Sequence, residues 1–254
     1  MASKSVLNQG FQIVAHRGYK ALVCENTLQA FTQALKAGAT MLELDVHLSA
    51  DGEAVVLHDA TMQRLANDRR HVANLSWNAL KTMPLYDKRA RSHPEGHVLR
   101  LEELFSHIGS GCNYCVEIKY APRQSSLYHH KLCETVCAII QQNHLSKHCM
   151  FVCSEIPLLA KLQAMAPHIP AGWVFEFEKQ LLALPKIRSM NLVLCPRAGL
   201  LTEQRTREMI RKGFSLMPWT VNRESEMRRL MDWGVAGITT DEVERLVGVC
   251  SGKL

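Results

Sequence analysis

Short apolar, β-rich stretches alternate along this chain with longer segments of helical periodicity. The expected strands cover residues 11–16, 41–47, 54–58, 114–119, 149–153, 171–176, 191–195, 214–221 and 236–240. The expected helices cover residues 26–37, 126–143, 155–166, 202–212 and 223–233. Such alternation is typical of parallel strands joined by crossover helices, and at about 250 residues it favours a TIM barrel, the (β/α)8 fold. The sequence therefore predicts an α/β protein of this type.

One expected strand is too many for a barrel of eight. Only "LSADGE", residues 48–53, separates the strands at 41–47 and 54–58. Because a parallel crossover needs about a dozen residues or more, these two strands are expected to form an antiparallel hairpin. Asp51 and Gly52 would lie at its turn. The predicted barrel is therefore distorted near its second strand.

Residues 59–100 follow neither period, and "DKRARSHPEGH" at 87–97 is dense in charge, proline and glycine. An insertion placed after a strand end lies over the barrel mouth, the end at which the carboxyl ends of the strands open. A lid is one interpretation of this insertion, and a surface loop without function is the other. Residues 1–254 are expected to form one domain that contains it.

Charge and hydropathy exclude several classes of protein. The 30 Lys and Arg residues exceed the 24 acids by six, and they are spread along the chain, which suits a small anionic substrate and gives no stripe for nucleic acid. The chain contains no run of about 18 apolar residues, so no integral membrane segment is predicted. The first dozen residues also lack the apolar segment of a secretory signal. These features predict a cytoplasmic protein, monomeric or homodimeric.

The chain has nine cysteines, an odd number that fits a reducing compartment better than a disulfide framework. Three pairs are close in sequence: Cys112/Cys115, Cys133/Cys137 and Cys149/Cys153. A structural zinc site needs four ligands, usually in two such clusters, so these residues are interpreted as plain thiols.

Carboxylates alternate with apolar residues in "MLELDVHL", where Glu43 and Asp45 share one face of the expected strand. Helices cover the outside of a barrel, so the two acids are expected to face its interior, where unpaired charge is costly. In "CVEIKY", Glu117 and Lys119 share a face in the same way. Three converging carboxylates favour Mg²⁺ or Ca²⁺. Buried ion pairs with Lys119 or an arginine are the alternative.

Two histidines end expected strands: His16 in "IVAHR" and His58 in "AVVLHD". A single histidine at a strand end is usually structural, but barrel active sites are assembled at that rim, so two of them suggest a proton donor and a proton acceptor. Arg17 carries a planar fork that matches two phosphate oxygens, although a salt bridge to Glu25 is its alternative. No glycine-rich nucleotide loop is present. These residues indicate chemistry on an anionic phosphoryl group.

In these segments the sequence resembles the glycerophosphodiester phosphodiesterase family, cytosolic and bacterial in type. The resemblance lies in "VAHRG" (14–18), "ENTLQAF" (25–31), "ELDVHLSADGEAVVLHD" (43–59), "VEIK" (116–119), "PWTVN" (218–222) and "WGVAGITTD" (233–241). It implies a TIM barrel of the phosphodiesterase type. It also implies hydrolysis of deacylated phospholipids to glycerol phosphate and an alcohol.

The resemblance further implies a role for each site residue. Glu43, Asp45 and Glu117 would bind Mg²⁺ or Ca²⁺, and His16 and His58 would be the general acid and base. The resemblance does not say which histidine is the acid; we favour His58. Arg17 and Lys119 would hold the phosphate. Trp219 would line the glycerol pocket, or else be a core aromatic residue. Glu25 and Asn26 would support the His16 loop, unless Asn26 or Thr27 only caps the helix that follows.

Three alternatives to this function remain open at this point. The chain could be a lysophospholipase D or a phosphatidylinositol-type phosphodiesterase on the same barrel, or a non-catalytic module that binds phosphodiesters. Two stretches also depart from the family, "VCSEIP" after the fifth strand and "LCPRAG" at the seventh expected strand. Both fall on the expected pocket wall, so they leave the choice of head group open.

Overall fold

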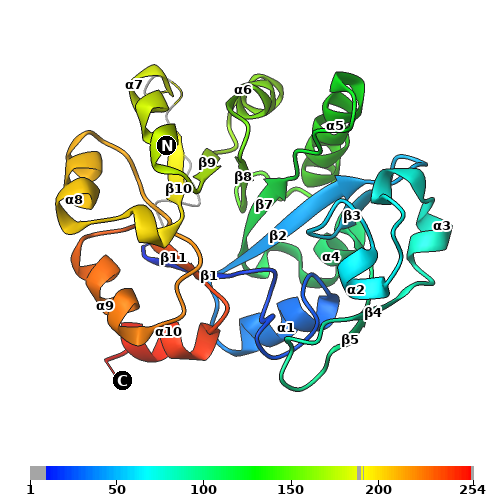
Figure 1. The fold of residues 1–254 in the computed structure, drawn as a ribbon, viewed down its shortest axis with the longest axis horizontal. Helices are drawn as coiled ribbons and strands as arrows, with labels where there is room; N and C mark the ends of the chain where they lie inside the picture. The colour runs from blue at the N-terminus through cyan, green and yellow to red at the C-terminus, as the bar shows by residue number, and fades with distance from the viewer. Residues whose placement is uncertain (1–9, 188–189, 191, 253–254) are drawn as a thin grey trace.

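The computed structural model describes residues 10–187, 190 and 192–252. Its centre is a parallel sheet in the order β10-β9-β8-β7-β2-β1-β11, surrounded by helices (Figure 1). The strands are β1 (Gln12–Ala15), β2 (Met41–Leu48), β7 (Asn113–Ile118), β8 (Cys149–Cys153), β9 (Ala171–Phe175), β10 (Val193–Pro196) and β11 (Gly237–Thr240). The alternating pattern of the sequence is thus realised as the predicted α/β fold. The segment 1–9, which bears on the predicted lack of an export signal, and residue 191 of the seventh expected strand lie outside the described residues.

The regular ladder is interrupted between β10 and β11, where a strand was expected at residues 214–221. This segment forms only isolated bridges, one to Leu194 of β10 and one to Arg197 just after β10. Its backbone still contacts both neighbours, since Met217 donates to Leu194 (2.8 Å) and Thr239 donates to Pro218 (3.0 Å). Pro218 has no N–H to continue a ladder. The prediction of a regular strand here is wrong, and hydrogen bonds of an irregular segment join β10 to β11.

The hairpin predicted near the second strand is confirmed. Strand β3 (Ala54–Val56) pairs antiparallel with β2, and also with the short strand β6 (Leu99–Arg100). At the turn, Ser49 donates its backbone N–H to Glu53 (2.9 Å). The second strand therefore carries an antiparallel branch that the other parallel strands of the sheet lack.

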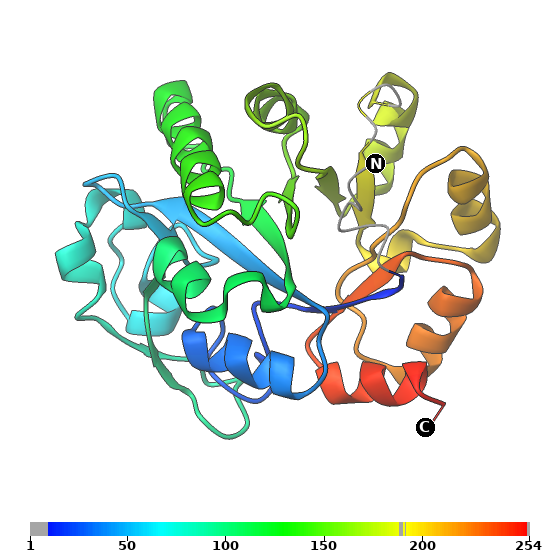
Figure 2. The same ribbon diagram turned by 180° about the vertical axis from the view of Figure 1, so that it is seen from behind.

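The five expected helices are present, and they lie outside the strands (Figures 1 and 2). They are α1 (Leu28–Lys36), α5 (Ser126–Gln142), α6 (Ile156–Met165), α8 (Glu203–Arg211) and α9 (Glu224–Asp232). Outside the insertion at 59–100, three further helices were not predicted: α4 (Leu101–Ile108), α7 (Leu184–Ile187) and α10 (Val243–Cys250). These helices have eight residues or fewer, too short for a clear periodic signal.

The insertion at residues 59–100 contains short elements that its composition did not reveal. They are α2 (Gln63–Ala66), a 3-10 turn (Val72–Asn74), α3 (Trp77–Leu80), β4 (Pro84–Tyr86) and β5 (Glu95–His97). Apolar residues of the insertion, Met62 and Leu80 among them, pack with Val55 and Leu57 in a small cluster separate from the main core. The insertion is thus anchored to the β3 side of the barrel. A lid function stays a prediction.

Side-chain alternation along β2 and β7 decides what faces the barrel interior. Leu42, Leu44 and Val46 belong to the main core between the sheet and its helices. Met41 and Cys115 belong to a second cluster inside the ring of strands. The acids of β2 alternate with the outward leucines, so they share the interior face, as the sequence predicted.

Candidate active site

Three carboxylates meet where β2 and β7 run side by side. Asp45 pairs with Glu117 across the two strands, and Glu43 lies two residues before Asp45 on the same face. One oxygen from each of the three lies within 4.8 Å of the others. Glu43 and Asp45 are buried, whereas Glu117 is partly exposed. The convergence that spacing alone predicted is therefore present.

These carboxylates fit a divalent cation by their charge and by their unmet contacts. Burial, together with the charges of Asp45 and Glu117, raises the pKa of Glu43 well above its ordinary value. The Oδ1 atom of Asp45 is buried and accepts no hydrogen bond. Three hard oxygen donors of this kind are ligands suited to Mg²⁺ or Ca²⁺. A cation bound there would relieve the repulsion among the acids.

The ion pairs anticipated as the alternative are also present, but they cover only part of the cluster. Lys119 Nζ lies 3.2 Å from Asp45 Oδ1 and 2.8 Å from Glu117 Oε1. Burial opposes ionisation of Asp45, yet Lys119 and Arg17 hold its pKa well below the ordinary value. Among the described residues, Glu43 is in no ion pair and accepts only the backbone N–H of Arg17, at 2.8 Å. The ion pairs thus leave one carboxylate uncompensated.

The loop after β1 places Arg17 over these acids through an unusual backbone conformation. Arg17 has φ 56°, in the left-handed region that residues other than glycine rarely adopt. Gly18 follows at φ 75°, and a Cβ there would lie 2.6 Å from the backbone of Ala30 in α1. The tight turn directs the Arg17 N–H at Glu43 and its guanidinium at Asp45 (3.3 Å) and Glu25 (3.1 Å).

Residues 25–27 support this loop from the start of α1. Asn26 donates its side-chain amide to Asp45 Oδ2 (2.8 Å), and the Asn26 backbone N–H bonds to the Arg17 carbonyl (3.0 Å). Thr27 is the N-cap of α1, because its hydroxyl accepts from Ala30 N. The capping role left open between Asn26 and Thr27 therefore falls to Thr27.

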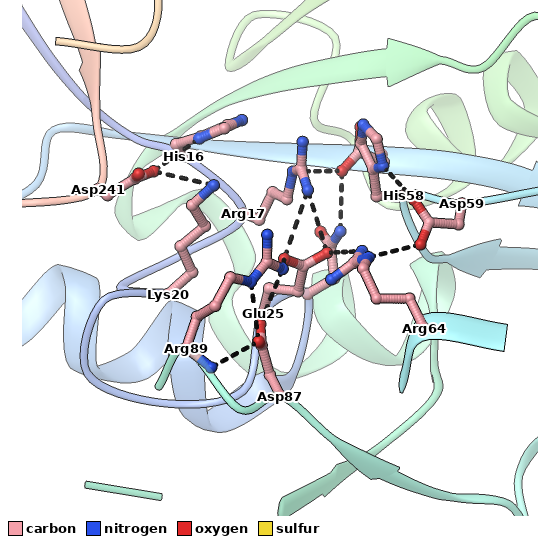
Figure 3. Close-up of polar contacts among 12 residues, drawn as sticks. His16, Arg17, Lys20, Glu25, His58, Asp59, Arg64, Asp87, Arg89 and Asp241 are labelled. Carbon is pink, nitrogen blue, oxygen red and sulfur yellow. Dashed lines mark hydrogen bonds and ion pairs between the residues drawn. The ribbon is translucent and has the colours of Figure 1, made fainter. Parts of the chain in front are cut away.

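His16 extends from the end of β1 and is held by a distant aspartate. Its Nδ1 lies 2.7 Å from Asp241 Oδ1, directly after β11. Asp241 is in turn held by Lys20 Nζ at 3.1 Å (Figure 3). It also accepts a hydrogen bond from the Asn222 amide at 3.0 Å. Burial lowers the pKa of His16 to about 4, and the hydrogen bond to Asp241 only partly offsets that effect. His16 is accordingly neutral near pH 7.

His58 follows β3 and has a partner in the adjacent residue. Its Nδ1 lies 2.6 Å from Asp59 Oδ1, and Arg64 Nε donates to Asp59 Oδ2, also at 2.6 Å. The His58 side chain is 32% exposed, against 11% for His16. Each histidine thus contacts a carboxylate at Nδ1, and among the described residues no hydrogen-bond partner engages its Nε2, which leaves that nitrogen available for chemistry.

One pocket joins the residues predicted from sequence. The pocket is lined by His16, Arg17, Glu43, His58, Glu117, Lys119 and Trp219. Asp45 lies buried beside Arg17 and Lys119. The opposite wall is largely apolar and is formed by Val152, Val174, Cys195, Met217 and Trp219. Trp219 is partly buried and donates its indole N–H to the Cys195 carbonyl (2.8 Å). The pocket therefore has a charged side and an apolar side.

Sequence reasoning missed several partners of these residues. Asp59 follows His58 directly in "LHD", so adjacency was an available signal. Asp241 ends the family segment "WGVAGITTD", but nothing in the local sequence links it to His16. Arg64 and Arg89, from the insertion, each lie 2.6 Å from a Glu25 oxygen. Their segment has no clear periodicity, so no pattern pointed to them.

The chain was compared with known protein families and with known proteins. A family model described as "Glycerophosphoryl diester phosphodiesterase family" matches residues 16–245. A glycerophosphodiester phosphodiesterase of Caldanaerobacter subterraneus is 28% identical over 240 residues, which is 93% of this chain and 96% of that protein. A human lysophospholipase D is 25% identical over 265 residues, covering 92% of this chain and 84% of that protein.

A solved structure resembles the whole chain. It is that of an Oleispira antarctica phosphodiesterase in complex with the product sn-glycerol-3-phosphate. It superposes with a TM-score of 0.84 at 19% identity, and the match covers 97% of this chain and 99% of that one. At this identity the likeness shows a shared fold.

Proposed function

Since the chain belongs to the glycerophosphoryl diester phosphodiesterase family, we propose that it hydrolyses glycerophosphodiesters such as glycerophosphocholine and glycerophosphoethanolamine. The products would be sn-glycerol 3-phosphate and the head-group alcohol. One observation carries the proposal: a single pocket brings together two histidines, the cationic side chains of Arg17 and Lys119, and a cluster of carboxylates. That combination binds a phosphodiester and moves protons at its ester oxygens.

Glu43, Asp45 and Glu117 would hold one divalent cation, Mg²⁺ or Ca²⁺. Bound there, the cation would supply positive charge to the phosphate oxygens and make a nearby hydroxyl group more acidic. Two observations support this assignment: the buried Oδ1 of Asp45 accepts no hydrogen bond from the described residues and has Lys119 Nζ 3.2 Å away, and the pKa of Glu43 is raised.

His16 would accept the proton of the nucleophile, which is either water or the glycerol hydroxyl group; attack by the hydroxyl would give a cyclic phosphate that water then opens to glycerol phosphate. Its Nδ1 is engaged with Asp241, so its Nε2 is the free nitrogen, and its lowered pKa, about 4, keeps the ring neutral and able to accept a proton near pH 7. His58 would donate a proton to the oxygen of the departing alcohol. Its greater exposure supports this role, because a leaving head group needs an open side of the pocket.

Arg17 and Lys119 would bind the phosphate from the charged side of the pocket. Both already contact carboxylates, which keeps them oriented and charged: the pKa of each is raised above its ordinary value by these acids despite burial. Trp219, on the opposite wall, would contact the glycerol carbons.

A coupled assay for glycerol 3-phosphate release, run over several head groups with Mg²⁺, with Ca²⁺ and with EDTA, tests this function. We expect turnover that EDTA abolishes and a divalent cation restores. Turnover that is indifferent to chelation would instead favour the ion-pair role of Glu43, Asp45 and Glu117. No turnover on any head group, with either metal, would leave a non-catalytic binding module.

The human relative gives a second candidate, lysophospholipase D activity. The apolar wall, with Val152 and Val174, is the observation that favours it, since it offers a surface to an acyl chain. Rates on glycerophosphocholine and lysophosphatidylcholine separate the two candidates.

Along the described chain, no helix has both the length and the apolar character to cross a membrane. A cytoplasmic location and a monomeric or homodimeric state stay predictions.

A further inference from the structure

A single buried carboxylate connects the insertion to the active site. Glu25 is fully buried, and three guanidinium groups contact it: Arg17 at 3.1 Å, Arg64 at 2.6 Å and Arg89 at 2.6 Å. Burial opposes ionisation of Glu25, yet Arg17, followed by Arg64 and Arg89, lowers its pKa below the ordinary value. Glu25 is therefore ionised, and its buried charge is compensated by ion pairs with the three arginines.

Each of the three arginines also reaches a second carboxylate (Figure 3). Arg17 contacts Asp45 (3.3 Å), in the carboxylate cluster. Arg64 contacts Asp59 (2.6 Å), the partner of His58. Arg89 contacts Asp87 (3.0 Å), within the insertion itself. A guanidinium has a rigid planar fork, so an arginine held at both ends fixes the distance between its two partners.

The contacts form one continuous chain from the phosphate side of the pocket to the more exposed histidine. It runs from Arg17 through Glu25, Arg64 and Asp59 to His58. His58 lies just after β3, the short antiparallel branch outside the parallel ladder, and its own side chain is partly exposed. Its orientation therefore depends on the Asp59 carboxylate, and that carboxylate depends on Arg64.

We propose that Arg64 is a positioning residue for catalysis, which orients His58 through Asp59 and ties it to Arg17 through Glu25. The inference rests on the proposed function for the role of His58, but the contacts that carry it do not. Arg64 is neither among the residues that line the pocket nor in the carboxylate cluster. Its effect on the reaction would pass entirely through its two carboxylate partners.

Arg89 and Arg70 supply matched controls from the same insertion. Arg89 shares the Glu25 contact of Arg64, but its other end holds Asp87 instead of the partner of a histidine. Arg70 is exposed and pairs with Asp68 (2.6 Å), and neither residue contacts Glu25 or Asp59. Lysine keeps the charge of an arginine but lacks the fork that spans two carboxylates.

The test compares R64K, R89K and R70Q by kcat, KM, melting temperature and the NMR signal of the hydrogen-bonded Nδ1 proton of His58. We expect R64K to lower kcat about 5-fold to 10-fold, no more than loss of the Asp59 carboxylate itself, with KM changed by less than about twofold, and to broaden or shift the His58 signal. R89K should lower the melting temperature and leave kcat within about threefold. R70Q should match the wild type in all four measurements.

Wild-type kcat with an unchanged His58 signal in R64K would overturn the proposal, and so would an equal loss of kcat in R89K. If R64K does not fold, D59N removes the carboxylate that joins Arg64 to His58 and leaves the Arg64–Glu25 ion pair in place. The readouts are again kcat and the NMR signal of His58. The NMR signal also separates two failures. A wild type that hydrolyses no glycerophosphodiester contradicts the proposed function, whereas an unperturbed His58 in R64K contradicts the positioning role.

Discussion

The two histidines of the pocket have the same kind of partner but reach it in opposite ways. His16 bonds to Asp241, 225 residues away in sequence, whereas His58 bonds to the residue that follows it. His16 lies on the parallel ladder between β1 and β11, where its backbone N–H donates to Thr240 (3.0 Å). His58 lies at the edge of the insertion. The His16–Asp241 dyad therefore depends on assembly of the barrel, whereas the His58–Asp59 dyad depends on local sequence (Figure 3).

This difference has consequences for electrostatics and for robustness. The barrel buries His16 and lowers its pKa, so Asp241 has to hold a neutral ring in one tautomer. The His58 ring is more exposed, and water can replace a lost partner there. Loss of the carboxylate should therefore be more damaging on the His16 side than on the His58 side.

The largest effects should come from removal of either ring. We expect H16A and H58A each to lower kcat by about 10³-fold or more, because each would remove one proton transfer. Glycerol 3-phosphate release with Mg²⁺ or Ca²⁺ measures the loss, and the melting temperature confirms folding. Full activity in either folded variant would show that the two dyads do not share one reaction.

Substitution of the carboxylate partners should separate the two sides. We expect D241N to lower kcat about 100-fold, since an amide can favour the wrong tautomer of a buried ring, and D59N to lower it about 10-fold. The measurement is kcat for both variants at the same pH. Equal losses, or a larger loss in D59N, would contradict the inference from burial.

The free energy of unfolding should reveal the burial of His16 through its pH dependence. Below pH 6.5 the unfolded chain takes up a proton on this residue, while the folded protein takes it up only near pH 4. The contribution of His16 to the free energy of unfolding is therefore complete above pH 6.5 and is lost as the pH drops towards 4. The loss amounts to about 3 kcal/mol for the metal-free protein. H16N should lose this part of the slope in urea unfolding measured at several pH values.

Buried His47 also has its pKa lowered to about 4, so a similar slope should remain in H16N. The control for the His16 slope is the wild type measured in parallel with EDTA present. Identical pH dependence in wild type and H16N would mean that burial of His16 does not act on stability in this way.

The smallest effect should come from the apolar side of the pocket, away from both dyads. W219F removes the indole N–H donated to Cys195 but keeps an aromatic ring. We expect KM for glycerophosphocholine to rise about threefold, with kcat changed by less than about twofold. A large fall in kcat without a change in KM would place Trp219 with the proton-transferring groups.

Much of the charged side of the pocket was predictable because its signals are local. Strict alternation in "MLELDVHL" places Glu43 and Asp45 on one face, and the ends of two β-rich runs locate His16 and His58. The hairpin followed from the short spacer between β2 and β3. In contrast, residues 214–221 have the composition of a strand, but Pro218 and their position between β10 and β11 leave them irregular.

What the sequence determined by itself was the parallel strands of the sheet, the hairpin of β2 and β3, the five longest helices, the face on which each acid lies, and the residue types available at the strand ends. These depend on side-chain periodicity and chain connectivity, which act over a few residues. Only the tertiary structure decided that Asp241 would meet His16 and that Arg17, Arg64 and Arg89 would share Glu25. Those contacts join segments that become neighbours only when the strands assemble and the insertion packs against them, since a buried charge selects its partner by proximity in space.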